Sequence, residues 1–292
     1  MSALGLAPVA WRGDRPDVTG VSQRWRAGRA GWRHRDDVVD TSRLEVVELT
    51  RDRDAKAFVL EHHYSGSYPA AKLRYGLVDR RTDRLVGVCV LGVPMQDKVL
   101  SNVFPDLQAG ASSVELSRLV LLDDPVVGAN AESWMVSRVF RLAADRGVRG
   151  IVAFSDPLRR VRSDGTVVLP GHVGFVYQAL GAVHLGRSAR RSILVLPDAT
   201  VLSSRALAKV RAGERGHEYV ERHLVGLGAV PRTVGADPRV WLARALEDVG
   251  ARSMRHPGNF RYAWAIGSLA QRRTVRIDGE VCAYPKHADL AA

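Results

Sequence analysis

Residues 130–155, NAESWMVSRVFRLAADRGVRGIVAFS, place a helix directly before a strand, and this pair decides the fold. Apolar residues recur at helical spacing in the first part, which predicts an amphipathic helix. They are Met135, Val136, Val139, Phe140 and Ala143. Asn130 is suited to cap the start of this helix, and Gly147 is suited to end it. The apolar run GIVAFS then predicts a short buried strand.

The segments around this pair alternate between strand and helix patterns. The residues before it predict strands over 44–49, 73–79, 84–93 and 112–124, and a helix over 52–63. The residues after it predict a helix over 174–180, strands near 182–185 and 191–196, and helices over 203–211, 216–225 and 238–249. A turn at 256–259 precedes FRYAWAIGSL, which fits a strand or a helix.

This order, rich in hairpins before a long helix and a strand, resembles the GNAT acyltransferase fold. The resemblance implies a mixed α/β sheet with splayed middle strands and an acyl donor such as acetyl-CoA. The donor's pyrophosphate would lie at the start of the helix after the fourth strand, where backbone N–H groups favour phosphate. Gly128 and Asn130 fall at that place, but the leading Gln or Arg of the usual pattern is missing. Asp123 and Asp124 next to it also disfavour a pyrophosphate.

A possible active site follows the strand 150–155. Ser155-Asp156-Pro157 ends the strand with a carboxylate, and a short helix after His172 carries Tyr177 and Gln178. Strands that deliver polar groups at their carboxyl ends commonly build sites in α/β enzymes. A structural interpretation remains open, because Asp before Pro often starts a turn and a tyrosine on an amphipathic helix often lies in the core.

Several segments together resemble the Mom family of phage DNA-modification proteins, a divergent group with a GNAT-like fold. They are EHHYSGS (61–67), ELSRL (115–119), residues 130–134, SDP (155–157), GHVG (171–174), YQA (177–179), GNFRY (258–262) and YPK (284–286). The resemblance covers about residues 55–287. It implies a transferase that converts the exocyclic amine of adenine in DNA to a carbamoylmethyl-type derivative, which protects the DNA from restriction. It also places the family's catalytic Asp and Tyr on Asp156 and Tyr177.

The residues themselves fit such chemistry. An aromatic amine is a weak nucleophile, so its modification needs a proton acceptor and a polarised donor. Asp156 can accept the proton, Tyr177 can donate to a leaving group or an oxyanion, and His172 can orient either of them. Ser133 can contact the donor or merely cap its helix. The base must leave the duplex for a pocket, so we expect a further group of residues to bind the substrate. It comprises Tyr64, Tyr68 and Tyr75, which can stack on the base or pack under the sheet, and Arg118.

A metal site is an additional hypothesis. His62 or His63, together with Glu61, Asp156 and His172, forms a set of imidazole and carboxylate groups suited to iron or zinc. Adjacent residues of a helix point about 100° apart, so only one of the two neighbouring histidines can face the site.

The positive charge is concentrated outside the expected catalytic core. The chain has a net charge of +12, and residues 44–186 contribute only 17 basic against 16 acidic residues. Residues 187–222 hold eight basic and four acidic residues, and residues 232–273 hold eight and three. This distribution favours a phosphate-binding surface and DNA as a partner, although any single arginine is more often just solvated. The arginines assigned to DNA contacts are Arg159, Arg160, Arg162, Arg187, Arg190, Arg191, Arg261, Arg272 and Arg273.

We therefore expect three parts: a flexible or peripheral Arg- and Trp-rich segment (1–43), a GNAT-like catalytic domain (44–200), and a basic, mainly helical C-terminal extension (201–292). Two cysteines and the lack of a long apolar run or signal sequence favour a cytoplasmic protein without a membrane span. Two other functions remain open: an acyl-CoA-dependent acetyltransferase of a small amine or protein, and a non-catalytic DNA-binding protein on a GNAT scaffold.

Overall fold

The computed structural model describes residues 21–26, 29–34, 37–63, 65–169 and 171–290. The helices are α1 (Asp52–His62), α2 (Lys98–Ser101), α3 (Ala131–Asp145), α4 (Phe175–Ala179), α5 (Ser204–Ala212), α6 (Glu218–Gly226), α7 (Pro238–Asp248) and α8 (Leu269–Thr274), with a 3-10 helix at His287–Leu290. The strands are β1 (Val21–Arg26), β2 (Arg29–His34), β3 (Leu44–Glu48), β4 (Ala71–Asp79), β5 (Arg84–Gly92), β6 (Ser113–Leu121), β7 (Gly150–Ser155), β8 (Arg160–Val161), β9 (Val167–Leu169), β10 (Val183–Arg187), β11 (Arg191–Val195), β12 (Val201–Leu202), β13 (Arg252–His256) and β14 (Phe260–Ala265).

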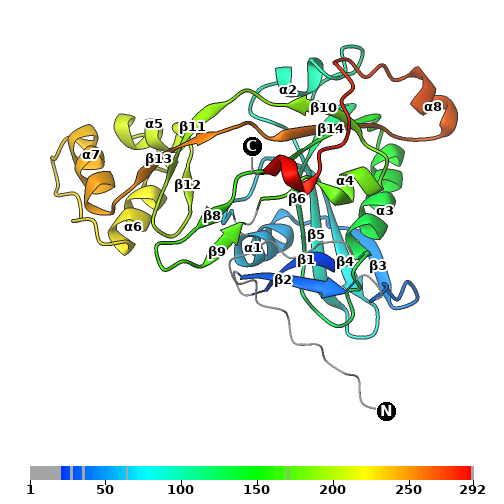
Figure 1. Ribbon diagram of the computed structural model, residues 1–292, viewed down its shortest axis with the longest axis horizontal. Helices are drawn as coiled ribbons and strands as arrows, with labels where there is room; N and C mark the ends of the chain where they lie inside the picture. The colour runs from blue at the N-terminus through cyan, green and yellow to red at the C-terminus, as the bar shows by residue number, and fades with distance from the viewer. Residues whose placement is uncertain (1–20, 27–28, 35–36, 64, 170, 291–292) are drawn as a thin grey trace.

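A seven-stranded sheet in the order β10-β14-β7-β6-β5-β4-β3 forms the main body (Figure 1). All neighbouring strands are antiparallel except β6 and β7, which run parallel. This one parallel pair joins only residues 113–116 to residues 150–153, so the two strands separate beyond Leu116 and Ala153. The mixed sheet with splayed middle strands confirms the predicted GNAT-like fold.

Helices cover both faces of the sheet. The predicted helix over 130–146 is confirmed as α3, and its buried residues Met135, Val136 and Val139 join the largest core cluster. α1 packs through Ala55, Phe58 and Val59 into a separate cluster with Val88 and Val90 of β5. A strand that is apolar on both faces is buried between helices, which explains the continuous apolar run in β5.

The predicted cap of α3 is wrong. Asn130 precedes the helix, but its side chain makes no capping hydrogen bond. Instead, Oδ1 accepts a hydrogen bond of 2.8 Å from the backbone N–H of Val39. The side chain that was expected to start the helix therefore fastens a segment 91 residues earlier in the chain.

A small lobe is inserted between two strands of the sheet. β11, β12, β13 and helices α5, α6 and α7 surround a core of their own that includes Leu196, Val210, Leu224 and Leu242 (Figure 1). The chain then returns as β14, which pairs with β10 and β7. The helices expected in a C-terminal extension thus form an insertion, because FRYAWA is a central strand that completes the main sheet.

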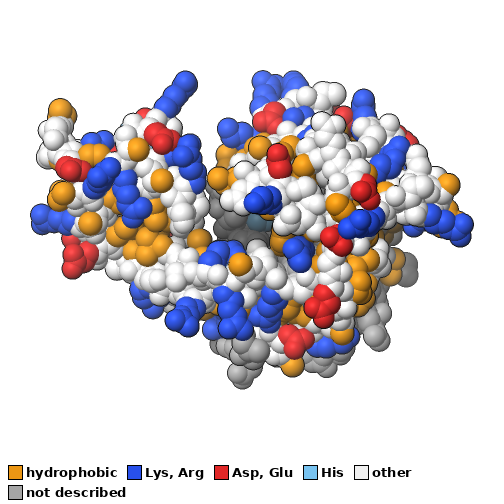
Figure 2. All heavy atoms as spheres, turned by 90° about the horizontal axis from the view of Figure 1, so that it is seen from above, with side chains coloured by type: hydrophobic (Ala, Val, Ile, Leu, Met, Phe, Trp, Pro, Cys, Tyr) orange, Lys and Arg blue, Asp and Glu red, His pale blue; other side chains and the backbone are white. Residues whose placement is uncertain are grey.

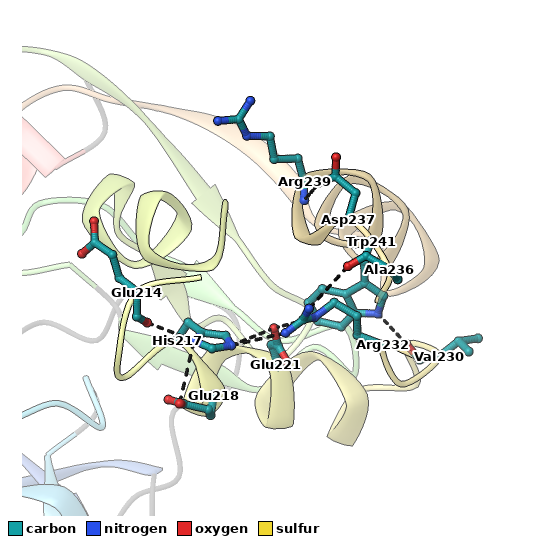
Figure 3. Close-up of polar contacts among 10 residues, drawn as sticks. All are labelled: Glu214, His217, Glu218, Glu221, Val230, Arg232, Ala236, Asp237, Arg239 and Trp241. Carbon is teal, nitrogen blue, oxygen red and sulfur yellow. Dashed lines mark hydrogen bonds and ion pairs between the residues drawn. The ribbon is translucent and has the colours of Figure 1, made fainter. Parts of the chain in front are cut away.

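Polar contacts hold the loop between α6 and α7 in this lobe (Figure 3). Arg232 donates from Nε to Glu221 over 3.0 Å, and His217 Nε2 lies 3.3 Å from the same carboxylate. Trp241 donates from Nε1 to the carbonyl oxygen of Val230 over 2.8 Å. These contacts hold the loop against two helices although its Val230 and Val234 side chains are exposed.

Two segments predicted as irregular contain short hairpins. β8 and β9 pair within the loop that follows Asp156, and β1 pairs with β2 over residues 21–26 and 29–34. The N-terminal segment expected to be flexible or peripheral therefore includes regular structure where it is described. Among the described residues, no helix has the length and apolarity needed to cross a membrane.

The lobe is joined to the body where two chain segments cross closely. The N–H of Ser188 donates to the carbonyl oxygen of Asn259 over 2.8 Å, and the N–H of Asn259 donates to Ser188 Oγ over 2.9 Å. Gly258, the residue before Asn259, has φ +94°, and an added Cβ would lie 2.0 Å from the carbonyl oxygen of Ser188. Only glycine combines this backbone conformation with this approach.

We expect Gly258→Ala to lower the free energy of unfolding by more than about 2 kcal/mol, because it adds a backbone clash to the strain of a positive φ. Gly250→Ala is the matched control, since Gly250 has φ +70° but nothing within 4 Å of an added Cβ. It should cost about 1 kcal/mol, the strain alone. Urea denaturation followed by circular dichroism measures both, and equal losses would contradict the close crossing.

Candidate active site

Asp156 lies directly after β7, where β6 and β7 have separated. Its Oδ1 accepts hydrogen bonds from His256 Nε2 over 3.0 Å and from the N–H of Leu158 over 2.9 Å. Its Oδ2 accepts from Arg160 over 2.9 Å. The carbonyl oxygen of Asp156 in turn accepts from the N–H of His172 over 2.9 Å. Both the carboxylate and the backbone of Asp156 are therefore fixed by groups from different segments.

These contacts keep Asp156 ionised. Burial raises the pKa of the carboxyl, but the hydrogen bond from His256 and the charge of Arg160 outweigh it and hold the pKa below its ordinary value. Arg160 is itself buried, with 8% of its surface exposed. A buried arginine and a buried carboxylate compensate each other only when both are well hydrogen-bonded, which makes this pair sensitive to the loss of either member.

Two neutral histidines lie near this pair. Burial lowers the pKa of His63 to about 3, and its electrostatic interactions with Arg118, His172 and Arg160 lower it further. Burial also lowers the pKa of His172, although the negative charge of Asp156 opposes this. In the described part of the chain, neither ring nitrogen of His172 has a hydrogen-bond partner. His172 is thus a neutral imidazole beside an ion pair, with its nitrogens available.

β6, the strand that runs parallel to β7, contributes Arg118 and a bulge to the site. The pairing of β5 with β6 shifts between Val90 and Leu91, which leaves Ser117 without a partner in register. Arg118, next to this bulge, donates from Nε to the carbonyl oxygen of Ser67 over 3.1 Å and from Nη2 to Ser67 Oγ over 2.9 Å. The predicted substrate residue Arg118 therefore links β6 to the loop after α1.

Glu115 lies on the same strand and is a functional candidate that the sequence analysis did not select. Burial raises the pKa of Glu115, and the positive charge of Arg118 opposes that effect. A largely buried carboxyl with a raised pKa beside a site is a common feature of functional clusters. Its sequence signal, a lone Glu in an apolar strand, is weak.

The predicted aromatic residues have different surroundings. Tyr177 is 9% exposed, and its ring contacts are with Tyr262 at 5.4 Å and Trp264 at 5.6 Å. Tyr75 is fully buried under the sheet in the main core. The contacts found for Tyr177 and Tyr75 are packing contacts, which agree with the structural interpretation that the sequence left open for these tyrosines.

Tyr68 is partly exposed and donates from its hydroxyl to Asp52 over 2.9 Å. Burial and the hydrogen bond to Asp52 raise its pKa to about 12. Tyr64 lies outside the described residues. Tyr68 is thus the described tyrosine of this set that reaches the surface on the α1 side.

The loop assigned to a donor pyrophosphate is covered by the chain itself. An added Cβ on Gly128 would lie 2.3 Å from the backbone nitrogen of Val39. The N–H of Ala129 donates to the carbonyl oxygen of Asp37, and Asn130 accepts from Val39. Ser133, the remaining donor candidate, donates to the carbonyl oxygen of Asn130 over 3.0 Å.

Coenzyme A does not fit this loop in the GNAT manner. A phosphate needs free N–H groups and space beside them. At Gly128–Asn130 the space holds residues 37–39, and two carboxylates, Asp123 and Asp124, precede the loop.

The predicted metal set is not assembled. His62 lies 3.7 Å from the exposed carboxylate of Glu61 and stacks edge-on against Phe58, at 4.6 Å between ring centroids. His63 Nδ1 instead accepts from the N–H of Ser65 over 3.1 Å. Among the described residues, no group of three or more His, Cys, Asp or Glu side chains is arranged to hold a metal ion. The hypothesis of iron or zinc therefore has no support in the structure.

The arginines predicted to contact DNA fall into three groups. Arg159, Arg162, Arg190 and Arg191 are exposed on the hairpin after Asp156 and on the strands that lead to the lobe. Arg160, Arg187 and Arg261 have structural partners: Asp156, the ring of Phe260 at 4.5 Å, and the carbonyl oxygen of Leu185 at 3.0 Å. Arg272 and Arg273 lie on α8, at the end of the molecule away from the lobe (Figure 1).

His256 was not among the predicted site residues. It was assigned to a turn, because His-Pro-Gly-Asn has the composition of one, and no local pattern connects it to a carboxylate 100 residues earlier. Only the insertion of the lobe between β10 and β14 brings the two residues together.

Comparisons with known proteins place this chain in a family. A model of the Mom protein family matches residues 43–274. The chain therefore belongs to the Mom family, as its motifs predicted. No curated protein matches the sequence.

Solved structures that resemble it are acetyltransferases and their relatives. A tandem GNAT protein from the clavulanic acid biosynthesis pathway is 12% identical, with a TM-score of 0.38 over 77% of this chain and 99% of that chain. The aminoglycoside 6'-N-acetyltransferase from Enterococcus faecium is 17% identical, with a TM-score of 0.32 over 52% of this chain and 88% of that chain.

We expect His63 to make the protein less stable in acid. The unfolded chain takes up a proton on His63 near pH 6.5, whereas the folded protein does so only near pH 3. Between these values the unfolded state binds more protons, so this contribution to stability is intact above pH 6.5 and falls as the pH drops, by at most about 1.4 kcal/mol per pH unit.

The variant His63→Asn tests this, because its Oδ1 can accept the Ser65 N–H in place of Nδ1 but does not titrate. Urea denaturation from pH 7.5 to pH 4 should give a shallower loss of stability than in the wild type. Parallel curves for the two proteins would refute the assignment.

Proposed function

We propose that this protein is a DNA base-modifying transferase that adds a small acyl or carbamoylmethyl-type group to the exocyclic amine of adenine and so protects phage DNA from restriction. The observation that carries the proposal is the cluster of Asp156, Arg160 and His172 at the separation of β6 and β7, in a chain of the Mom family. An ion pair beside an unpartnered imidazole is suited to handling a proton at a reacting centre.

The structure favours His172 as the proton acceptor. Adenine's amine forms a bond to the electrophilic carbon of the donor, the donor's leaving group takes the displaced electron pair, and the amine gives up one proton. The carboxylate of Asp156 already accepts three hydrogen bonds and is a poor acceptor for this proton. His172 is neutral, and its backbone is fixed on Asp156. We assign proton transfer to His172 and the alignment of the site to Asp156.

Positive charge near this cluster supports a polyanionic substrate. Figure 2 shows a hollow between the lobe and the main body that is bordered by Lys and Arg side chains. The exposed Arg159, Arg162, Arg190 and Arg191 lie on the segments that run from Asp156 and β10 towards the lobe. Cations on both sides of a cleft hold a phosphate backbone in place without reading its sequence.

The donor in this proposal is a small molecule that is not held by a pyrophosphate at Gly128. An acetyl-CoA-dependent reaction on a small amine would require that loop to open. Titration calorimetry with acetyl-CoA therefore separates the two functions: binding of acetyl-CoA but not of DNA would select the acetyltransferase.

The main experiment measures modified bases directly. The protein is expressed together with a plasmid, the DNA is digested to nucleosides, and mass spectrometry searches for a new adenine adduct. We expect the adduct with the wild type and none with Asp156→Ala, because Arg160 loses its partner and His172 loses the negative charge beside it. Arg276→Ala is a matched control, since its exposed side chain pairs with Asp278 at 3.6 Å. The same adduct from wild type and Asp156→Ala would exclude the role of Asp156, and no adduct from either would leave a DNA-binding protein.

The pH dependence tests the role of His172. Only neutral His172 accepts a proton, so the rate should fall as the pH drops through its pKa, which lies below the ordinary 6.5. The negative charge of Asp156 raises this pKa, so Asp156→Asn should lower it further. Imidazole NMR titration of both proteins measures the change, and a rise in the pKa of His172 in Asp156→Asn would contradict the arrangement.

A further inference from the structure

His256 is a buried histidine of the lobe whose ring contacts the main body. It is the last residue of β13, is 2% exposed, and places Nε2 3.0 Å from Asp156 Oδ1. Its other ring nitrogen, Nδ1, accepts the backbone N–H of Gly258 over 3.0 Å. Because Nδ1 accepts, the ring proton must be on Nε2, so the imidazole donates to the carboxylate rather than taking a proton from it.

The tautomer is set by the crossing that joins the lobe to the body. Gly258 donates to His256 from a backbone with φ +94°, and that backbone is fixed by the close approach of Ser188. In the pairing of β13 with β11, His256 lies opposite Arg191, an exposed cation at the start of β11. The tautomer of the His256 ring thus depends on the arrangement of the two segments, at Ser188 and Gly258, that join the lobe to the body.

We propose that His256 is a positioning residue that locks the Asp156 carboxylate, and with it the side chain of Arg160 and the negative charge beside His172, in the orientation set by the lobe. The proposal rests on the proposed function, because it assigns a role at the same site. It adds that the lobe, besides contributing positive charge, completes the alignment of the reacting groups.

The geometry of the carboxylate explains why this contact matters. Arg160 donates to Oδ2, and the backbone N–H of Leu158 donates to Oδ1. Loss of His256 removes a donor to Oδ1 that comes from a distant segment, so the carboxylate can turn. Its hydrogen bond to Arg160 and its negative charge beside His172 then shift. Groups that orient an active-site residue through a second hydrogen bond commonly affect rate more than substrate affinity.

Two substitutions separate positioning from packing. In His256→Gln the side-chain amide nitrogen can take the place of Nε2 and donate to Asp156, whereas His256→Leu fills the space without a donor. We expect His256→Leu to lower the maximal rate of adduct formation by about 10-fold to 100-fold, with the DNA concentration for half-maximal rate and the DNA affinity little changed. His256→Gln should recover most of that loss.

His184 provides the matched control for a buried histidine. It is 5% exposed and bonds through Nδ1 to the carbonyl oxygen of Ala283 over 2.7 Å, without contact to Asp156. His184→Leu should lower stability without lowering the rate of the folded protein. Equal rate losses in His256→Leu and His256→Gln, or a loss in His256→Leu no larger than in His184→Leu, would overturn the proposal.

Nitrogen NMR of the histidine rings tests the contact without activity. The wild type should show His256 protonated on Nε2 and unprotonated on Nδ1, and Asp156→Asn should change the Nε2 signal. His256→Leu should shift the His172 ring signals, whereas His184→Leu should not. A protonated Nδ1 in the wild type, or an unchanged His172 in His256→Leu, refutes the positioning role. A wild type that makes no adduct but shows these signals refutes the proposed function alone.

Discussion

The separation of two parallel strands is the constraint on which the site depends. β6 and β7 pair over four residues each and then part, so beyond Leu116 and Ala153 the two strands no longer pair with each other and keep only their outer neighbours, β5 and β14. Buried polar groups need partners. The bulge at Ser117, the arginine beside it and the ion pair at Asp156 all lie along this opening. The chemistry is therefore placed where the sheet itself leaves room and polar groups unpaired.

The order of elements could be predicted from the sequence because each element carries a local signal. The spacing of Met135, Val136 and Val139 located α3, and alternating or continuous apolar runs located the strands of the sheet. FRYAWA was ambiguous, since a short apolar run fits a strand or a helix until its neighbours are known. Its place between β10 and β7 is a long-range property that no local pattern contains.

The site was predictable only in part for the same reason. Asp156 and His172 stand near a strand end in the sequence, and the structure joins them through a backbone hydrogen bond. The site contacts of His256 and Glu115 and the contact of Asn130 with Val39 all depend on distant segments. Local composition alone indicated a turn at His256, a strand at Glu115 and a helix cap at Asn130. Tyr177 was selected from its position in the family motif, and its catalytic role stays a prediction, while its described ring contacts include Tyr262 and Trp264.

The insertion of the lobe at one point of the sheet bears on how proteins with this architecture acquire different substrates. Residues 188 and 259, where the lobe begins and ends, are joined by one backbone hydrogen bond and by one from the Asn259 N–H to Ser188 Oγ, and the strands next to them, β10 and β14, are antiparallel neighbours. A short turn between these residues would make an ordinary hairpin and leave the sheet intact. The lobe is thus exchangeable in evolution or by design without redesigning the sheet, provided that its replacement supplies a donor for Asp156.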